Sequence, residues 1–112
     1  MIEEIVRDFL NRNLSYPVYM EIPKSSPSQF YIVEKTGSSE SNHISSSTLT
    51  IQSYADTLFN AADMNDELKK AMRYQLIELD AIASVELNGD YNYTDTTTKR
   101  YRYQAVFDIV HY

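Results

Sequence analysis

The chain has 112 residues, of which 43% are hydrophobic and 23% charged, as is typical of one globular domain with an apolar core. Its net charge of −6 argues against general binding to nucleic-acid phosphates, which requires a basic surface. The lack of cysteine excludes disulfides and zinc–thiolate sites, and no apolar run approaches the roughly 18 residues that a membrane helix needs.

Residues 2–14 are expected to form an amphipathic helix. Glu3 and Glu4 would lie in its first turn, where the helix dipole favours negative charge. This acidic segment lacks the basic region and the cleavage site of a signal peptide, so we do not expect a leader. The apolar residues recur at the spacing of one helical stripe, and they are Ile2, Ile5, Val6, Phe9 and Leu10.

Two short strand-like runs follow, YPVYMEIP over residues 16–23 and QFYIVEK over residues 29–35. Apolar residues alternate along both runs, which indicates strands with a buried face. The segment between them, PKSSPS, contains two prolines and is therefore expected to be a turn.

The serine-rich stretch TGSSESNHISSS, residues 36–47, is expected to be a long mobile hairpin loop. It does not look like a linker between domains, because the 35 residues before it are too few to bury a stable core. Two interpretations remain. The stretch is either a solvated loop without a role or an assembly arm that is loose in solution and ordered on a partner.

Residues 48–53 resume a strand pattern, with Leu49 and Ile51 on one side. The apolar period then changes to about 3.6, which predicts a helix over residues 54–78. Ser53 and Asp56 form a variant of the capping box and would mark its start. Asn65 interrupts the apolar face, so a kink or break near residue 64 is an open alternative.

The last two runs, over residues 82–95 and 98–112, are expected to be long strands joined by the polar turn TDTTT. In the second run, two groups of residues alternate over nine positions. One group is Tyr101, Tyr103, Ala105, Phe107 and Ile109, and the other includes Arg102, Gln104 and Asp108.

The predicted order is therefore α-β-β-β-α-β-β within a single domain spanning residues 1–112. Helices and strands are segregated along the chain, which indicates an α+β domain. We expect a mostly antiparallel sheet of about five strands, with two helices packed on one face.

The sequence shows no set of residues that indicates catalysis, a cofactor or a metal. His43 and His111 are interpreted as structural, because no nucleophile-elbow pattern accompanies the many serines. Metal-ligand spacings and a glycine-rich phosphate loop are also missing. The run KRYRYQAVF faintly resembles an RNA-stacking strand, but its alternation sends tyrosines and arginines to opposite faces. A core or subunit-interface role is the favoured interpretation.

The order of these motifs resembles phage tail-completion proteins, also called tail terminators or minor head–tail joining proteins. The resemblance lies in the N-terminal helix, in VYMEIPKSSPSQFYIVEKTG with the polar loop after it, in TLTIQSYA running into a long helix, and in the terminal YRYQAVFDIVHY. It spans most of the chain and rests on the order of loose motifs, so it carries no active site across.

The resemblance implies a structural virion protein at the neck or tail end, assembled in the cytoplasm of the bacterial host. Such subunits are monomers in solution or form a homo-hexameric ring that caps the tail tube protein and meets the head-completion or connector protein. DNA would pass through the lumen without specific binding, and no membrane is involved. A neck protein, or a small protein-binding adaptor acting as a monomer or dimer, is the alternative.

Under this interpretation, the contact residues lie in the segments expected to project furthest from the sheet. Arg100 and Arg102 are expected to form salt links with acidic neighbouring subunits. The full set of candidate protein-interface residues is Ser38, Ser39, Glu40, Asn42, His43, Asp95, Thr97, Lys99, Arg100 and Arg102.

Overall fold

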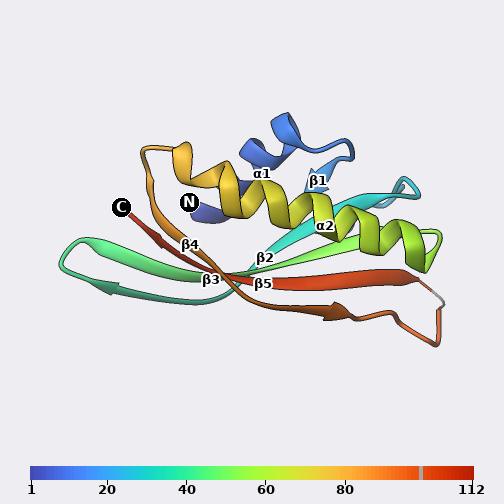
Figure 1. The fold of residues 1–112 in the computed structure, drawn as a ribbon. Helices are drawn as coiled ribbons and strands as arrows, with labels where there is room; N and C mark the ends of the chain where they lie inside the picture. The colour runs from blue at the N-terminus through green and yellow to red at the C-terminus, as the bar shows by residue number, and fades with distance from the viewer. Residues whose placement is uncertain (99) are drawn as a thin grey trace.

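The computed structural model describes residues 1–98 and 100–112, which form two α-helices and a five-stranded sheet (Figure 1). This confirms the predicted α+β class and the predicted order of elements. The elements are α1 (Ile2–Asn13), β1 (Val18–Tyr19), β2 (Phe30–Ser41), β3 (Ile44–Ala55), α2 (Leu58–Tyr74), the 3-10 turn η1 (Leu76–Glu78), β4 (Ile82–Asn92) and β5 (Tyr101–His111).

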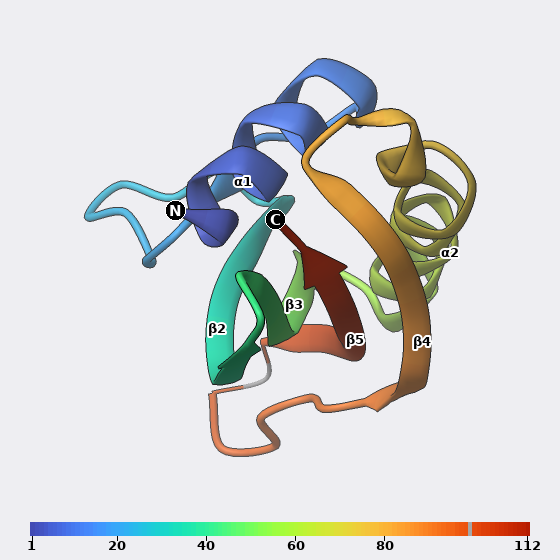
Figure 2. The ribbon, with the colours of Figure 1, turned by 90° about the vertical axis from the view of Figure 1, so that its left-hand side faces the viewer.

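The strands are arranged in the order β1-β2-β3-β5-β4, so β5 lies between β3 and β4. Among these strands, β1 and β2 pair in parallel and the other neighbours are antiparallel. The register of the central pair places Leu49 opposite Phe107 and Ile51 opposite Ala105. Directly opposed side chains share a face, so these four residues form one apolar layer. Figure 2 shows that the sheet is strongly curled, with β2 and β4 on opposite sides of β3 and β5.

Both helices lie on the same face of the sheet, as predicted (Figure 1). The core that they enclose contains fully buried side chains from α1, α2, β3 and β5, including Val6, Leu10, Leu49, Leu68 and Phe107. Each large apolar side chain that leaves water in this way stabilises the fold by about 1.5–3 kcal/mol. The alternation predicted for the last strand is confirmed, because its apolar residues face this core and Arg102 and Gln104 lie on the other face.

Helix α2 begins later than the sequence predicts and is not broken. Ser53 belongs to β3, and the N-cap is Thr57, whose Oγ1 accepts a hydrogen bond from the backbone N–H of Asn60 over 3.1 Å. A kink or break near residue 64 was an open alternative, but Asn65 is buried in the middle of one continuous helix. Its amide is tolerated there because Asp90 of β4 accepts a hydrogen bond from it over 2.8 Å.

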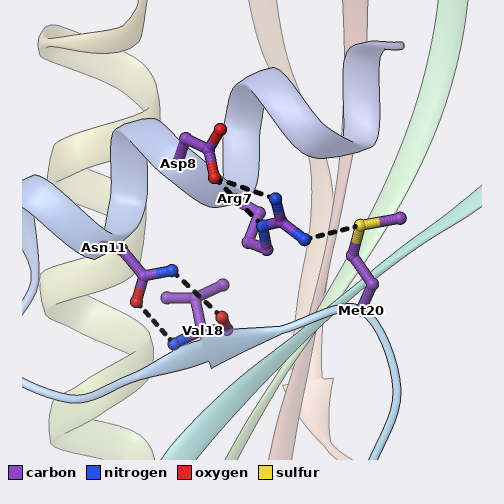
Figure 3. A network of polar contacts seen from close by, with 5 residues as sticks. All are labelled: Arg7, Asp8, Asn11, Val18 and Met20. Carbon is purple, nitrogen blue, oxygen red and sulfur yellow. Dashed lines mark hydrogen bonds and ion pairs between the residues drawn. The ribbon is translucent and has the colours of Figure 1, made fainter.

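The first predicted strand is reduced to the two residues of β1, and a side chain of α1 contacts the outer edge of this short strand (Figure 3). Asn11 donates from Nδ2 to the Val18 carbonyl over 3.1 Å and accepts from the Val18 N–H at Oδ1 over 2.9 Å. The amide of Asn11 thus satisfies the backbone groups of Val18 as a neighbouring strand would. This contact closes the outer edge of β1 against further pairing.

Candidate protein-interaction surfaces

Apart from Lys99, the interface residues predicted from the sequence fall into two groups at opposite ends of the molecule. The tip of the β2–β3 hairpin lies at one end and the β4–β5 connection at the other (Figure 1). The pairing of β3 with β5 explains this separation, because Ser45 lies opposite His111 and Ala55 opposite Tyr101. The molecule measures 44 × 25 × 25 Å, so the two groups terminate its long dimension.

The serine-rich stretch at the first end is a paired ribbon, and the expectation of a long loop is wrong. Strand β2 continues to Ser41 and β3 starts at Ile44, leaving a two-residue turn. The turn residues Asn42 and His43 have φ values of 53° and 65°, the left-handed conformations that two-residue hairpin turns require. Ser38, Ser39 and Glu40 are exposed along β2, as are Asn42 and His43 at the tip.

A serine and a histidine meet at the base of this hairpin. Ser47 Oγ lies 2.8 Å from His111 Nε2, and the two residues belong to the neighbouring strands β3 and β5. A catalytic triad also needs an acid that orients the second histidine nitrogen. Within the described residues, the side chain of His111 has no hydrogen bond or ion pair with a carboxylate. The contact therefore links two strands and gives no geometry for nucleophilic catalysis.

The connection at the other end is ordered by Asp95. Its Oδ1 accepts a hydrogen bond from the backbone N–H of Thr97 over 2.9 Å, and its own N–H donates to the Arg100 carbonyl over 3.3 Å. The hydrogen bonds from the Thr97 backbone and the Thr98 side chain lower the pKa of Asp95 below its usual value. Thr97 is exposed, whereas Lys99, also predicted as an interface residue, lies outside the described residues.

Arg102 is fixed on the helix-free face of the sheet by aromatic residues from neighbouring strands. Its Nη1 donates to Tyr54 Oη over 2.8 Å and its Nε donates to the Tyr93 carbonyl over 2.7 Å. The guanidinium also lies 4.6 Å from the centre of the Tyr93 ring. A stacked and hydrogen-bonded guanidinium loses little freedom on binding, which suits it to a protein interface.

The Arg100 guanidinium lies over a stacked pair of aromatic rings on the same face. The rings of Phe30 and Tyr54 stack with centres 4.8 Å apart and planes 8° apart. The Arg100 guanidinium lies 5.6 Å from the first ring centre and 5.1 Å from the second. Arg100 is exposed, and within the described residues it forms no ion pair. Phe30 and Tyr54 are buried, whereas Tyr93 is exposed. We call Tyr93, Arg100 and Arg102, with the buried Phe30 and Tyr54 that support them, the arginine–aromatic surface.

A chain of side-chain hydrogen bonds extends this surface across three strands. Tyr54 Oη donates to Gln52 Oε1 over 3.0 Å, and Gln52 Nε2 donates to Gln104 Oε1 over 2.9 Å. Gln104 in turn donates to the Tyr91 hydroxyl. Because each amide is held at both ends, these side chains are expected to keep one arrangement.

Sequence reasoning missed the aromatic part of this surface. Arg102 and the tyrosines of β5 do point to opposite faces, but β2, β3 and the segment after β4 bring Phe30, Tyr54 and Tyr93 to the arginine face. The alternation within one strand cannot reveal residues that a neighbouring strand supplies. These aromatic residues could have been found from the sequence only by first predicting which strands pair with β5.

An open hollow lies between α1 and the segment after β1, and the sequence did not indicate it (Figure 3). Arg7 Nη1 donates to Met20 Sδ over 3.4 Å, and its Nη2 lies 3.0 Å from Asp8 Oδ1. Glu21 and Lys24 also line the hollow. The hollow is thus lined by both positive and negative side chains, so it does not indicate a ligand of one chemical type.

The described residues contain no group of three or more histidine, aspartate or glutamate side chains placed to hold a metal ion. Neither described helix is long and apolar enough to cross a membrane. The sequence matches no protein-family model and no curated protein. Functional inference therefore rests on the residues and on the surfaces described above.

Proposed function

We propose that this protein is a structural virion protein of a long-tailed phage or prophage. It would form a ring on the end of the tail tube, stop tail polymerisation and provide the surface on which the head is joined. The sequence resemblance suggests this role, and the observation that carries it is the placement of two unlike projecting surfaces at opposite ends of one small domain.

A ring needs two such surfaces on every subunit. A closed ring is built from head-to-tail contacts, in which one patch of a subunit meets a different patch of the next. The hairpin end presents serine, Glu40 and His43, whereas the other end presents the arginine–aromatic surface. Arginine and tyrosine are enriched in protein interfaces, and Arg100 and Tyr93 are exposed here, so the second surface suits contact with a protein partner.

The charges of the chain favour acidic partners for Arg100 and Arg102. The chain carries a net charge of −6, so neighbouring copies offer many carboxylates. As exposed pairs, such contacts would each contribute only about 0–1 kcal/mol, so they would orient subunits more than hold them together. The same acidity suits a lumen through which DNA slides without sticking.

An assembly experiment tests the role directly. Virions produced without this protein should have either over-long tails, if it stops polymerisation, or tails of normal length that fail to join heads, if it acts only at the neck. Electron microscopy of the particles distinguishes these two outcomes. Intact infectious particles would rule out both roles.

A shortened hairpin tests the contribution of the first end. Removing Glu40, Ser41, Ile44 and Ser45 deletes two residues from each strand and keeps the two-residue turn, so the pairing of Ser39 with Ser46 is preserved. The ribbon becomes roughly 7 Å shorter without changing which side chains face the core. The variant should fold and fail to complete tails.

Charge reversal tests the second end. Arg100→Glu combined with Arg102→Glu should block completion, whereas Lys24→Glu, an exposed substitution outside this surface, should not. If both the shortened hairpin and the reversed arginines support normal assembly, these ends are not the contacts, even if omission of the protein shows that it is needed.

A further inference from the structure

Helix α2 carries a row of exposed residues on the side that faces away from the core. They follow one another at alternating spacings of four and three residues, which keeps them on one side of a helix. Figure 1 shows α2 lying at the surface over its whole length. Five exposed residues of α2 form this row, namely Phe59, Asp63, Asp66, Lys70 and Arg73, and exposed Ile77 of the 3-10 turn η1 follows them after the helix has ended. We call these six residues the outer stripe.

The order of residues in the outer stripe is self-complementary. An apolar residue is followed by two acids, then by two bases, and then by another apolar residue. Read from the opposite direction, every acid falls on a base and every apolar residue on an apolar one. Two antiparallel copies of the stripe would therefore match along its length.

We propose that the outer stripe binds the same stripe of a second copy of this chain, antiparallel and about a two-fold axis. In this register Asp63 faces Arg73 of the second copy and Asp66 faces its Lys70. Phe59 faces the second copy's Ile77. The contact is isologous, because each pair occurs twice, and two-fold dimers are the commonest symmetric assembly.

The charges of the stripe are available for such pairing. Within the described residues, Asp63, Lys70 and Arg73 form no ion pair. Asp66 lies 3.5 Å from Lys69, but that lysine is closer to Asp90, at 2.9 Å. A second copy would supply each unpaired charge with an opposite partner, which fixes both register and orientation.

The apolar ends of the stripe also lack cover within the subunit. The Phe59 side chain is 78% exposed although it is a large aromatic, and Ile77 is 41% exposed. Tyr74, beside Ile77, is 65% exposed and carries the Arg73 guanidinium 5.5 Å from its ring centre. Phe59 of a second copy would gain both an apolar and a cationic neighbour there.

This inference does not depend on the proposed ring. The stripe shares no residue with the hairpin or with the arginine–aromatic surface, and an isologous contact closes on itself. A dimer formed through α2 leaves both ends of each subunit free. Failure of one proposal therefore leaves the other standing.

Charge-swapped variants provide the test. The acid-to-base variant carries Asp63→Lys and Asp66→Lys, and the base-to-acid variant carries Lys70→Glu and Arg73→Glu. Sedimentation velocity of the unmodified chain should show a monomer–dimer equilibrium. Each variant alone should dissociate at least about tenfold more readily, because its stripe has one sign of charge. An equimolar mixture of the two should form a heterodimer.

Two further variants make the result interpretable. Phe59→Ala should weaken the dimer without affecting the fold, since the side chain is outside the core. Glu4→Lys with Glu21→Lys makes the same change in net charge at exposed positions away from α2 and should leave the dimer unchanged. Circular dichroism checks that each variant is folded. A chain that stays monomeric up to about 1 mM, swapped variants that dimerise as well as the unmodified chain, or a mixture that remains monomeric would each overturn the proposal.

Discussion

Asn65 Nδ2 donates a hydrogen bond to Asp90 Oδ2 over 2.8 Å, which fastens the middle of α2 to the edge strand β4. Lys69 Nζ reaches the same oxygen over 2.9 Å, and this hydrogen bond is the main reason that the pKa of Lys69 is raised. Asn65 is only 1% exposed. Its amide therefore has little access to water if the carboxylate is removed.

Asp90→Ala should destabilise the protein by about 1–3 kcal/mol, because it leaves a buried amide donor unpaired. Urea unfolding measures the change. Asp8→Ala provides the matched control, since it removes a carboxylate from the ion pair with Arg7, in which the Asp8 side chain is 52% exposed. That variant should stay within about 0.5 kcal/mol of the unmodified protein. Equal losses in the two variants would show that Asp90 acts only as a surface charge.

The stability of the fold should decrease in alkaline solution. Burial raises the pKa of the Tyr31 phenol, which donates to the Met64 carbonyl over 3.0 Å, and Asp90 raises that of Lys69. Both groups hold their protons in the folded state after the unfolded chain has released them. Above about pH 10 the free energy of unfolding should therefore fall, by up to about 1.4 kcal/mol per pH unit for each group.

Tyr31→Phe tests this assignment. The variant should be less stable at neutral pH, because it loses the hydrogen bond to Met64. Its stability should also depend less steeply on pH between about pH 9 and 11, because one titrating group is gone. Urea unfolding at several pH values measures both effects. An unchanged slope would show that Tyr31 does not contribute to the alkaline loss.

His43→Gly should stabilise the hairpin. His43 has a φ of 65°, a conformation that costs a residue with a Cβ roughly 1 kcal/mol and costs glycine little. Asn-Gly is also the preferred sequence for such a turn. A gain of about 0.5–1 kcal/mol in urea unfolding is expected, and His43→Val should produce a loss. If both substitutions are neutral, the turn does not hold this geometry in solution.

Two hydroxyl substitutions test where α2 begins. Thr57→Ala should cost about 1 kcal/mol, because the N-cap hydrogen bond to Asn60 is lost. Ser53→Ala should leave stability unchanged or raise it, because Ser53 Oγ is buried and has no hydrogen-bond partner among the described residues. The opposite ranking in thermal unfolding would support the capping position that the sequence predicts.

Apolar periodicity was sufficient to predict most of the fold. The pattern of Ala105, Phe107 and Ile109 placed β5 correctly, because each of these residues is fully buried on one face. A hairpin was predicted over residues 36–47, but its paired strands could not be predicted in this way, since its serines carry no apolar signal. Ser45 and Ser46 are held in a strand by neighbours on both sides, β2 and β5, and such pairing overrides composition.

The candidate surfaces were predicted less completely than the fold. Arg100 and Arg102 were selected from the sequence as contacts to acidic neighbouring subunits, which stays a prediction. Their aromatic partners come from segments whose order in the sheet the sequence does not specify. The contact that closes the outer edge of β1 comes from Asn11, which looks like an ordinary polar helix residue until its contact with Val18 is known. Both features arise from tertiary contacts between distant segments.

The position of β5 between β3 and β4 also has a consequence for how the chain folds. Strands β2 and β3, and likewise β4 and β5, are neighbours in sequence and can form as local hairpins. The seam between β3 and β5 joins residues about 46 to 66 positions apart, such as Ala55 with Tyr101 and Ser45 with His111. Closing such distant pairs is entropically slow, so this seam is expected to set the folding rate, in the range of milliseconds to seconds. Until it closes, the chain would consist of two separate hairpins whose apolar faces have no common core.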